Sequence, residues 1–200
     1  MARLALSKSS LSREKGQLSL FRRFLPSLDL KRRQLIAERA KAAAELIEAR
    51  QAIAENQALI GAEVPMLANA EVDLTGLVRL TGVVLGEENL LGTRLPLLES
   101  IEIEVLPYGT MVRPHWVDRV VELLHRMLEL HTLADVAEQR LALLDVAVRK
   151  ITQRVNLFEK VLIPRTAANI KRIQIYLSDA ERAAVVNSKL AKTRHAAVPA

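Results

Sequence analysis

Residues 120–162 read VVELLHRMLELHTLADVAEQRLALLDVAVRKITQRVNLFEKVL, and this stretch decides the fold. Counting in sevens from Val120 meets an apolar residue each time, and so does the set that starts at Leu123. Such a repeat is typical of a helix that buries a narrow stripe against a second helix. We predict that the coiled-coil core contains Val120, Leu123, Met127, Leu130, Leu141, Leu144, Val148, Ile151, Val155, Phe158 and Leu162.

This predicted C-terminal arm covers residues 114–190 and contains an unexpected proline, Pro164. Proline inside a helix removes a backbone hydrogen bond and clashes with the carbonyl one turn back, at a cost of ~3 kcal/mol. We expect that Pro164 either bends the helix or is tolerated because neighbouring packing offsets its cost. The arm starts with Pro114 in its first turn, and residues 191–200 are expected to form a flexible tail.

Residues 1–60 carry a second heptad pattern, which predicts an N-terminal coiled-coil arm. Most positions in sevens from Leu4 are apolar, and Phe21, Leu28, Leu35, Ala42 and Ala49 form the interleaved set. Pro26 interrupts this arm and either bends it or separates two helices.

Residues 61–113 lose the heptads and are expected to form a small head. The segment ESIEIEV at 99–105 alternates with period two, GEEN at 86–89 is predicted to be a turn, and a short helix is expected before them. We therefore predict one or two β-hairpins between Leu77 and Val105. The predicted fold class is mainly α: a long antiparallel two-helix coiled coil with a small insert that contains a short helix and a β-hairpin.

The composition supports long helices and excludes several classes of protein. Half of the 200 residues are hydrophobic but only 3% are aromatic, and there is no cysteine for a disulfide or a thiolate metal site. We expect no signal peptide, and we find no apolar run long enough to span a bilayer. Residues 1–60 carry 12 Lys/Arg against 6 Asp/Glu, residues 61–113 carry 3 against 8, and residues 114–200 carry 14 against 9.

A search for catalytic, cofactor-binding and metal-ligating residues predicts none of them. No phosphate-binding loop occurs, so Gly82 and Gly86 are expected to shape a strand or turn. His125 and His131 lie six residues apart, on different helix faces, and His115 is expected to make a helix-start contact. The serines and acidic pairs are interpreted as helix-start and solvated surface residues: Ser7, Ser9, Ser10, Ser12, Glu87, Glu88, Glu102 and Glu104. We thus expect no cofactor and no enzymatic activity.

The segment from Gln153, QRVNLFEKVLIPRTAANIKRI, resembles the C-terminal helix of the D subunit (the central stalk rotor) of the V-type and archaeal-type rotary ATPases. The residues that match this family's motif are Arg154, Val155, Asn156, Ile163, Pro164 and Arg165. Residues 6–38 are similar to the family's first helix, and GTRLP at 92–96 is similar to a turn in its insert. Pro26 and the segment SDAER at 178–182 depart from the family pattern.

The resemblance implies a non-catalytic central rotor shaft that couples H⁺ or Na⁺ flow to ATP synthesis or hydrolysis. Its implied partners are the catalytic and nucleotide-binding subunits of a hexamer, the small F subunit of the stalk and a ring-capping subunit. The chain would lie at the cytoplasmic face of the membrane and reach the membrane only through the complex. Two alternatives are a non-rotary coiled-coil adaptor and a basic hairpin that binds nucleic acid, although aromatic residues for base stacking are scarce.

The isolated chain is expected neither to bind nor to hydrolyse ATP, because its sequence holds no phosphate-cradling loop. Isothermal titration with Mg·ATP and a phosphate-release assay measure this directly. Micromolar binding by the purified chain would contradict the expectation.

Overall fold

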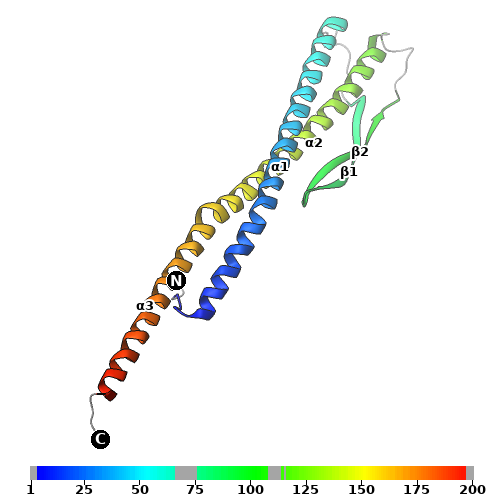
Figure 1. Cartoon of the computed structure of the whole chain (residues 1–200). Coiled ribbons are helices and arrows are strands. Elements are labelled where there is room, and N and C mark those ends of the chain that lie inside the picture. Colours follow the sequence, from blue (N-terminus) through cyan, green and yellow to red (C-terminus); the bar gives the residue numbers. More distant parts are fainter. Residues whose placement is uncertain (1–3, 66–75, 108–113, 115, 197–200) are drawn as a thin grey trace. The chain divides into compact units, whose positions relative to one another are not determined.

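The computed structural model describes residues 4–65, 76–107, 114 and 116–196. Its elements in chain order are helix α1 (Lys8–Glu63), strands β1 (Val78–Leu90) and β2 (Thr93–Val105), helix α2 (Trp116–Asn156), the π-helical turn η2 (Leu157–Leu162) and helix α3 (Ile163–Ala196) (Figure 1). The chain divides into two compact units. Unit 1 comprises Met1–Arg32 and Lys150–Ala200, and unit 2 comprises Arg33–Arg149.

In unit 2, α1 and α2 lie side by side and run in opposite directions (Figure 1). Glu63 at the end of α1 meets Arg119 near the start of α2, with 2.7 Å between carboxylate and guanidinium, and Arg50 meets Glu138 further along. Apolar residues at heptad spacing fill the contact between the helices. The buried ones are Leu35, Ala42 and Leu46 of α1 and Val120, Leu123, Ala134 and Leu144 of α2. The predicted antiparallel helix pair is therefore confirmed.

The head of unit 2 contains one antiparallel hairpin, in which β1 pairs with β2 from Val78 opposite Val105 to Leu90 opposite Thr93. The register shifts twice, between Leu80 and Gly82 and between Val84 and Leu85. The chain reverses at Leu91 and Gly92, which have φ angles of 52° and 79°. Two positive φ angles in a two-residue loop are typical of a type I′ turn, whose twist matches that of the strands. The Gly92 N–H donates a 2.9 Å hydrogen bond to Asn89 Oδ1 and thereby supports this turn.

The prediction of a turn at GEEN, residues 86–89, is wrong because these residues lie within β1. The glycine that reverses the chain is Gly92, and its partner Leu91 belongs to a type that rarely adopts positive φ. The predicted short helix falls largely on residues 66–75, outside the described residues. The base of the hairpin is held by α2, because Leu77 packs against Val117 and Val121.

In unit 1, the first part of α1 pairs with the segment that follows Lys150. Phe21 and Phe158 meet edge to face, with ring centroids 5.4 Å apart. Ser7 caps α1, since the Ser10 N–H donates a 3.2 Å hydrogen bond to Ser7 Oγ. α1 continues through Pro26, so this proline does not separate two helices.

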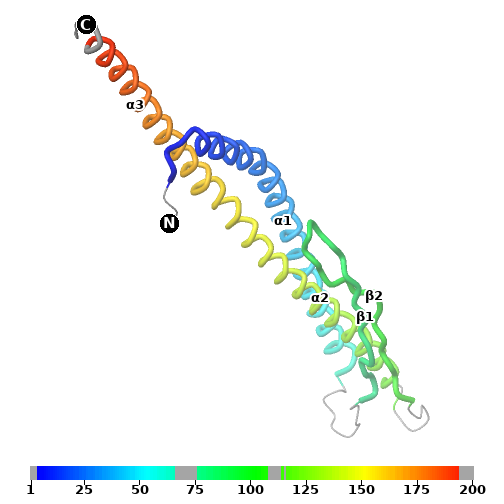
Figure 2. The backbone as a smooth tube through the Cα atoms, turned by 90° about the horizontal axis from the view of Figure 1, so that it is seen from below, coloured from blue at the N-terminus to red at the C-terminus, as the bar shows by residue number. Residues whose placement is uncertain are grey.

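The two ends of the C-terminal arm differ from the expected boundaries. α2 begins at Trp116, and Pro114 precedes it, with its carbonyl accepting a 3.0 Å hydrogen bond from the Val117 N–H. α3 continues to Ala196, so the predicted tail at 191–200 is helical at least that far. Within unit 1, α3 extends past the start of α1 (Figure 2), where Lys8 and Glu181 make an exposed ion pair of 3.6 Å.

The π-helical turn η2 lies directly before Pro164. The Ile163 N–H donates to the carbonyl oxygen of Phe158, five residues back rather than four. In an α-helix the Pro164 ring would clash with the carbonyl of Lys160, and a wider turn at that place relieves the clash. The cost of Pro164 is therefore offset by a local change of helix type, and α3 continues beyond it.

The hairpin turn should respond in opposite ways to changes at its two residues. Gly92→Ala places a Cβ at φ 79° and is expected to destabilise unit 2 by ~1 kcal/mol, whereas Leu91→Asn relieves an unfavourable φ and is expected to stabilise it. Urea unfolding of the full chain measures both changes. Equal effects of the two substitutions would contradict the turn type.

Candidate functional site

None of the predicted core residues of the C-terminal arm is exposed. Val120, Leu123, Leu144, Ile151 and Val155 are buried, with at most 4% of each residue exposed. The remaining members are half-buried: Met127, Leu130, Leu141, Val148, Phe158 and Leu162. The stripe supplies the core of unit 2 up to Val148 and of unit 1 from Ile151.

The six motif residues all lie in unit 1 but differ in how far they are buried. Val155 is buried in the core, and Asn156 and Ile163 are half-buried. Arg154, Pro164 and Arg165 are exposed or partly exposed around η2. Two cationic side chains and a proline ring therefore lie at the surface of this segment.

Sequence reasoning missed the core beyond Leu162. An uninterrupted heptad would place Arg165 and Arg172 in the core, but the structure buries Thr166 and Ile173, one position later in each case. The cause is η2, because a π-helical turn adds one residue and moves every later side chain by one position. The sequence does contain a signal of this shift, a second set of residues at heptad spacing: Thr166, Ile170, Ile173 and Leu177.

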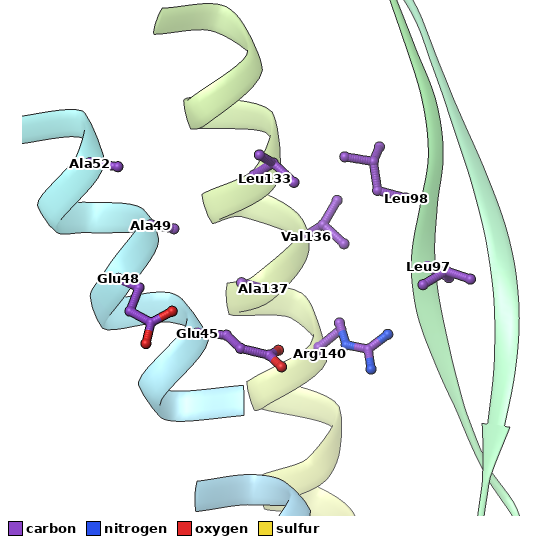
Figure 3. Close-up of a pocket in the computed structure, with 10 residues that line it drawn as sticks. All are labelled: Glu45, Glu48, Ala49, Ala52, Leu97, Leu98, Leu133, Val136, Ala137 and Arg140. Carbon is purple, nitrogen blue, oxygen red and sulfur yellow. The ribbon is translucent and has the colours of Figure 1, made fainter. Parts of the chain in front are cut away.

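An open groove of about 560 Å³ lies within unit 2, between the hairpin and both helices (Figure 3). Small or apolar side chains line most of it, and two carboxylates and one guanidinium complete the lining. The lining residues are Glu45, Glu48, Ala49 and Ala52 of α1, Leu97 and Leu98 of β2, and Leu133, Val136, Ala137 and Arg140 of α2. The groove has the size of a ligand pocket but presents no convergent polar group suited to bond chemistry.

Arg140 of α2 ties the hairpin to the helix at the edge of this groove. Its guanidinium donates to the backbone oxygen of Pro96 at 2.9 Å and to the Glu88 carboxylate at 3.0 Å. Glu88 belongs to β1 and Pro96 to β2, so one side chain holds both strands. The Arg140 side chain is only 21% exposed, which strengthens these charge-assisted bonds relative to those at an open surface.

Arg119 links the other end of the helix pair. It donates to Glu63 of α1 at 2.7 Å and to Glu122 of its own helix at 2.8 Å. The hydrogen bond from Arg119 lowers the pKa of Glu63, and the same bond raises the pKa of Arg119. Because these groups are exposed, the pair orients the helix ends and contributes little stability.

The structure places most of the residues that the sequence analysis considered as metal ligands or phosphate-loop glycines. No three His, Cys, Asp or Glu side chains among the described residues gather as metal ligands. His125 Nδ1 lies 3.4 Å from Glu129 Oε1 on the same helix, and Gly82 and Gly86 lie within β1. His115 lies outside the described residues. None of the described helices is long and apolar enough to cross a membrane.

The two units carry opposite net charges. Unit 1 contains 18 Lys/Arg against 5 Asp/Glu, a net charge of +13, and unit 2 contains 11 against 18, a net charge of −7, which together give the +6 of the chain. Large apolar side chains are also exposed on unit 1, including Phe24, Ile175 and Tyr176. Exposed apolar side chains beside dense positive charge are typical of a binding surface.

Comparison with known proteins decides the family. The family model for the ATP synthase D subunit matches residues 10–193. The chain belongs to the ATP synthase D subunit family. It is 34% identical to the D subunit of the V-type ATP synthase of Borreliella burgdorferi over 200 residues, covering 96% of this chain and 95% of the relative. The corresponding subunits of Chlamydia muridarum and Chlamydia abortus are 31% and 32% identical over 198 residues, with 96% of this chain covered and 96% and 94% of the relatives.

Removal of the Arg140 guanidinium should free the hairpin of this D subunit from α2. Arg140→Gln loses the charge and is expected to increase amide hydrogen exchange in β1 and β2 at least severalfold, while exchange in α1 stays unchanged. Arg126→Gln, at an exposed position of the same helix, is the matched control. Unchanged hairpin exchange in Arg140→Gln would show that apolar packing alone holds the hairpin.

Proposed function

We propose that this D subunit is the non-catalytic central rotor shaft of a V/A-type ATP synthase or ATPase. It couples H⁺ or Na⁺ flow across the membrane to ATP synthesis or hydrolysis in the catalytic hexamer. Family membership supports this proposal, and the observation that carries it is the apolar stripe that runs through the C-terminal arm and meets α1 in each unit. A shaft must resist twisting, and a continuous packed core between two helices provides that resistance.

The partners in this proposal are the catalytic and nucleotide-binding subunits of the hexamer, the small F subunit of the stalk and a ring-capping subunit. The net charge of +13 on unit 1 suits a partner surface that is acidic. Beyond Glu181, α3 exposes Val185, Val186 and Leu190, apolar residues that a surrounding partner would cover. The chain would be peripheral, at the cytoplasmic face, and would contact the membrane only through the complex.

A non-rotary adaptor would share the helix pair, so the decisive test is coupling. Ile151 and Val155 are buried on successive turns of α2, and the double change Ile151→Asp with Val155→Asp places two charges in this core. An unpaired polar group costs ~1–3 kcal/mol and a buried charge costs more, so the shaft should soften. We expect reconstituted complexes with this variant to retain ATP hydrolysis and to lose most ATP-driven ion pumping.

A matched control places the same two charges outside the core. Ala142 and Val146 have the same spacing on α2 and are both exposed, so Ala142→Asp with Val146→Asp should leave pumping near the wild-type level. ATP hydrolysis and vesicle acidification or Na⁺ uptake are measured on the same preparation. A core variant that assembles and pumps as well as the control would refute the shaft function.

A further inference from the structure

The π-helical turn η2 depends on a proline that lies outside the buried core. None of the six residues Leu157–Leu162 is buried, and the Pro164 ring, which makes the wider turn necessary, is exposed. Pro164 thus costs unit 1 a backbone hydrogen bond and a regular helical turn without adding to the core. Departures of this kind occur frequently at functional sites. The surface around η2 is therefore a candidate for an interaction site.

Exposed side chains follow one another along the helix across η2. Arg154, Leu157, Val161 and Arg165 are spaced by three or four residues, the spacing of neighbours on one helix face, and all four are exposed. Leu157 and Val161 each expose 47% of their surface. Together with Pro164, which precedes Arg165, these residues form what we call the η2 face. It presents two apolar side chains between two guanidinium groups.

A notch of about 250 Å³ lies at the N-terminal end of the η2 face. Its lining residues are Lys150, Gln153, Arg154 and Leu157. Lys and Arg supply charged donors, and Gln153 supplies a neutral one. A carboxylate side chain of a partner fits this lining, because hydrogen bonds from cationic donors to a carboxylate are among the strongest that side chains make.

The charge around the η2 face is almost entirely positive and is not neutralised by nearby residues. Residues 150–178 contain six Lys or Arg and one acidic residue, Glu159. None of the six cations forms an ion pair within the part of the chain that the structure describes. Like charges held this close repel one another, and a partner that carries carboxylates would relieve the repulsion.

We infer that the η2 face is the contact site of unit 1 for an apolar protein surface bordered by carboxylates, one of which occupies the notch. This inference rests on the proposed function and deepens it, since the surrounding hexamer is the partner that would carry such a surface. Nucleic acid fits less well, because Leu157 and Val161 offer no aromatic ring on which a base could stack.

The charged part of the η2 face is tested by the affinity of the full chain for the purified hexamer of catalytic and nucleotide-binding subunits. Arg154→Glu with Arg165→Glu reverses two charges on the face, and we expect the dissociation constant to rise at least about 30-fold at about 100 mM salt. Arg22→Glu with Arg23→Glu is the matched control, because it changes the net charge of unit 1 equally at exposed positions of α1. The control should raise the dissociation constant less than about fivefold.

The apolar part is tested without any change of charge. Leu157→Ser with Val161→Ser should raise the dissociation constant about tenfold, and by the same factor at low and high salt, because apolar contacts are not screened. Leu143→Ser with Val146→Ser, at exposed positions of α2 in unit 2, is the matched control and should bind as the unaltered chain does. All the altered residues are exposed, so the thermal midpoints should stay near that of the unaltered chain.

If either altered pair on the η2 face binds the hexamer as tightly as its matched control, the inference is wrong, while the shaft function stands. If the unaltered chain itself does not bind the hexamer, the proposed function fails as well. Tighter binding of the unaltered chain to a DNA duplex than to the hexamer, lost in Arg154→Glu with Arg165→Glu, would assign the face to nucleic acid and overturn the inference.

Discussion

A narrow apolar stripe on a long helix can be buried only by a second helix with a matching stripe. In this D subunit the two stripes lie at opposite ends of the sequence, so the intervening residues must reverse the chain. The pairing of Glu63 with Arg119 shows where that reversal brings the arms together in unit 2. Most of the structure follows from this constraint: the antiparallel direction, the heptad spacing of both cores and the confinement of the strands to the middle of the chain.

The sequence predicted those features that depend on periodicity. No predicted core residue from Val120 to Leu162 is exposed, although several are only half-buried, and the alternation of ESIEIEV falls within β2. The sequence did not predict the hairpin turn or the π-helical turn, because each depends on the backbone conformation of one or a few residues. Leu91 adopts a positive φ that its residue type disfavours, and of the segment GTRLP at 92–96, which resembles a turn of the family, only Gly92 lies in the turn while Thr93 begins β2. Likewise, a π-helical turn leaves no heptad mark of its own, and its effect is visible only in the shift of the core to Thr166 and Ile173.

Polar and charged groups at the surface have a different role from the apolar residues of the core. In the described residues, polar groups are used for caps, ion pairs and the Arg140 tie rather than for a convergent site. The segregation of charge between the units acts over longer distances and does not require fixed contacts. This arrangement suits the proposed rotor function, because long-range attraction to an acidic partner does not by itself favour one angular position.

In a helix pair of this kind, residues that strengthen the pairing do not help to select a single register. Every apolar residue added to the stripe strengthens the pairing, but it also makes pairings shifted by seven residues more nearly equal in energy. In unit 1 the hydrogen bond from Asn169 Nδ2 to Glu14 Oε2 joins two side chains of opposite helices, so a shift by seven residues separates them. A contact of this kind distinguishes between pairings that apolar packing alone leaves similar in energy.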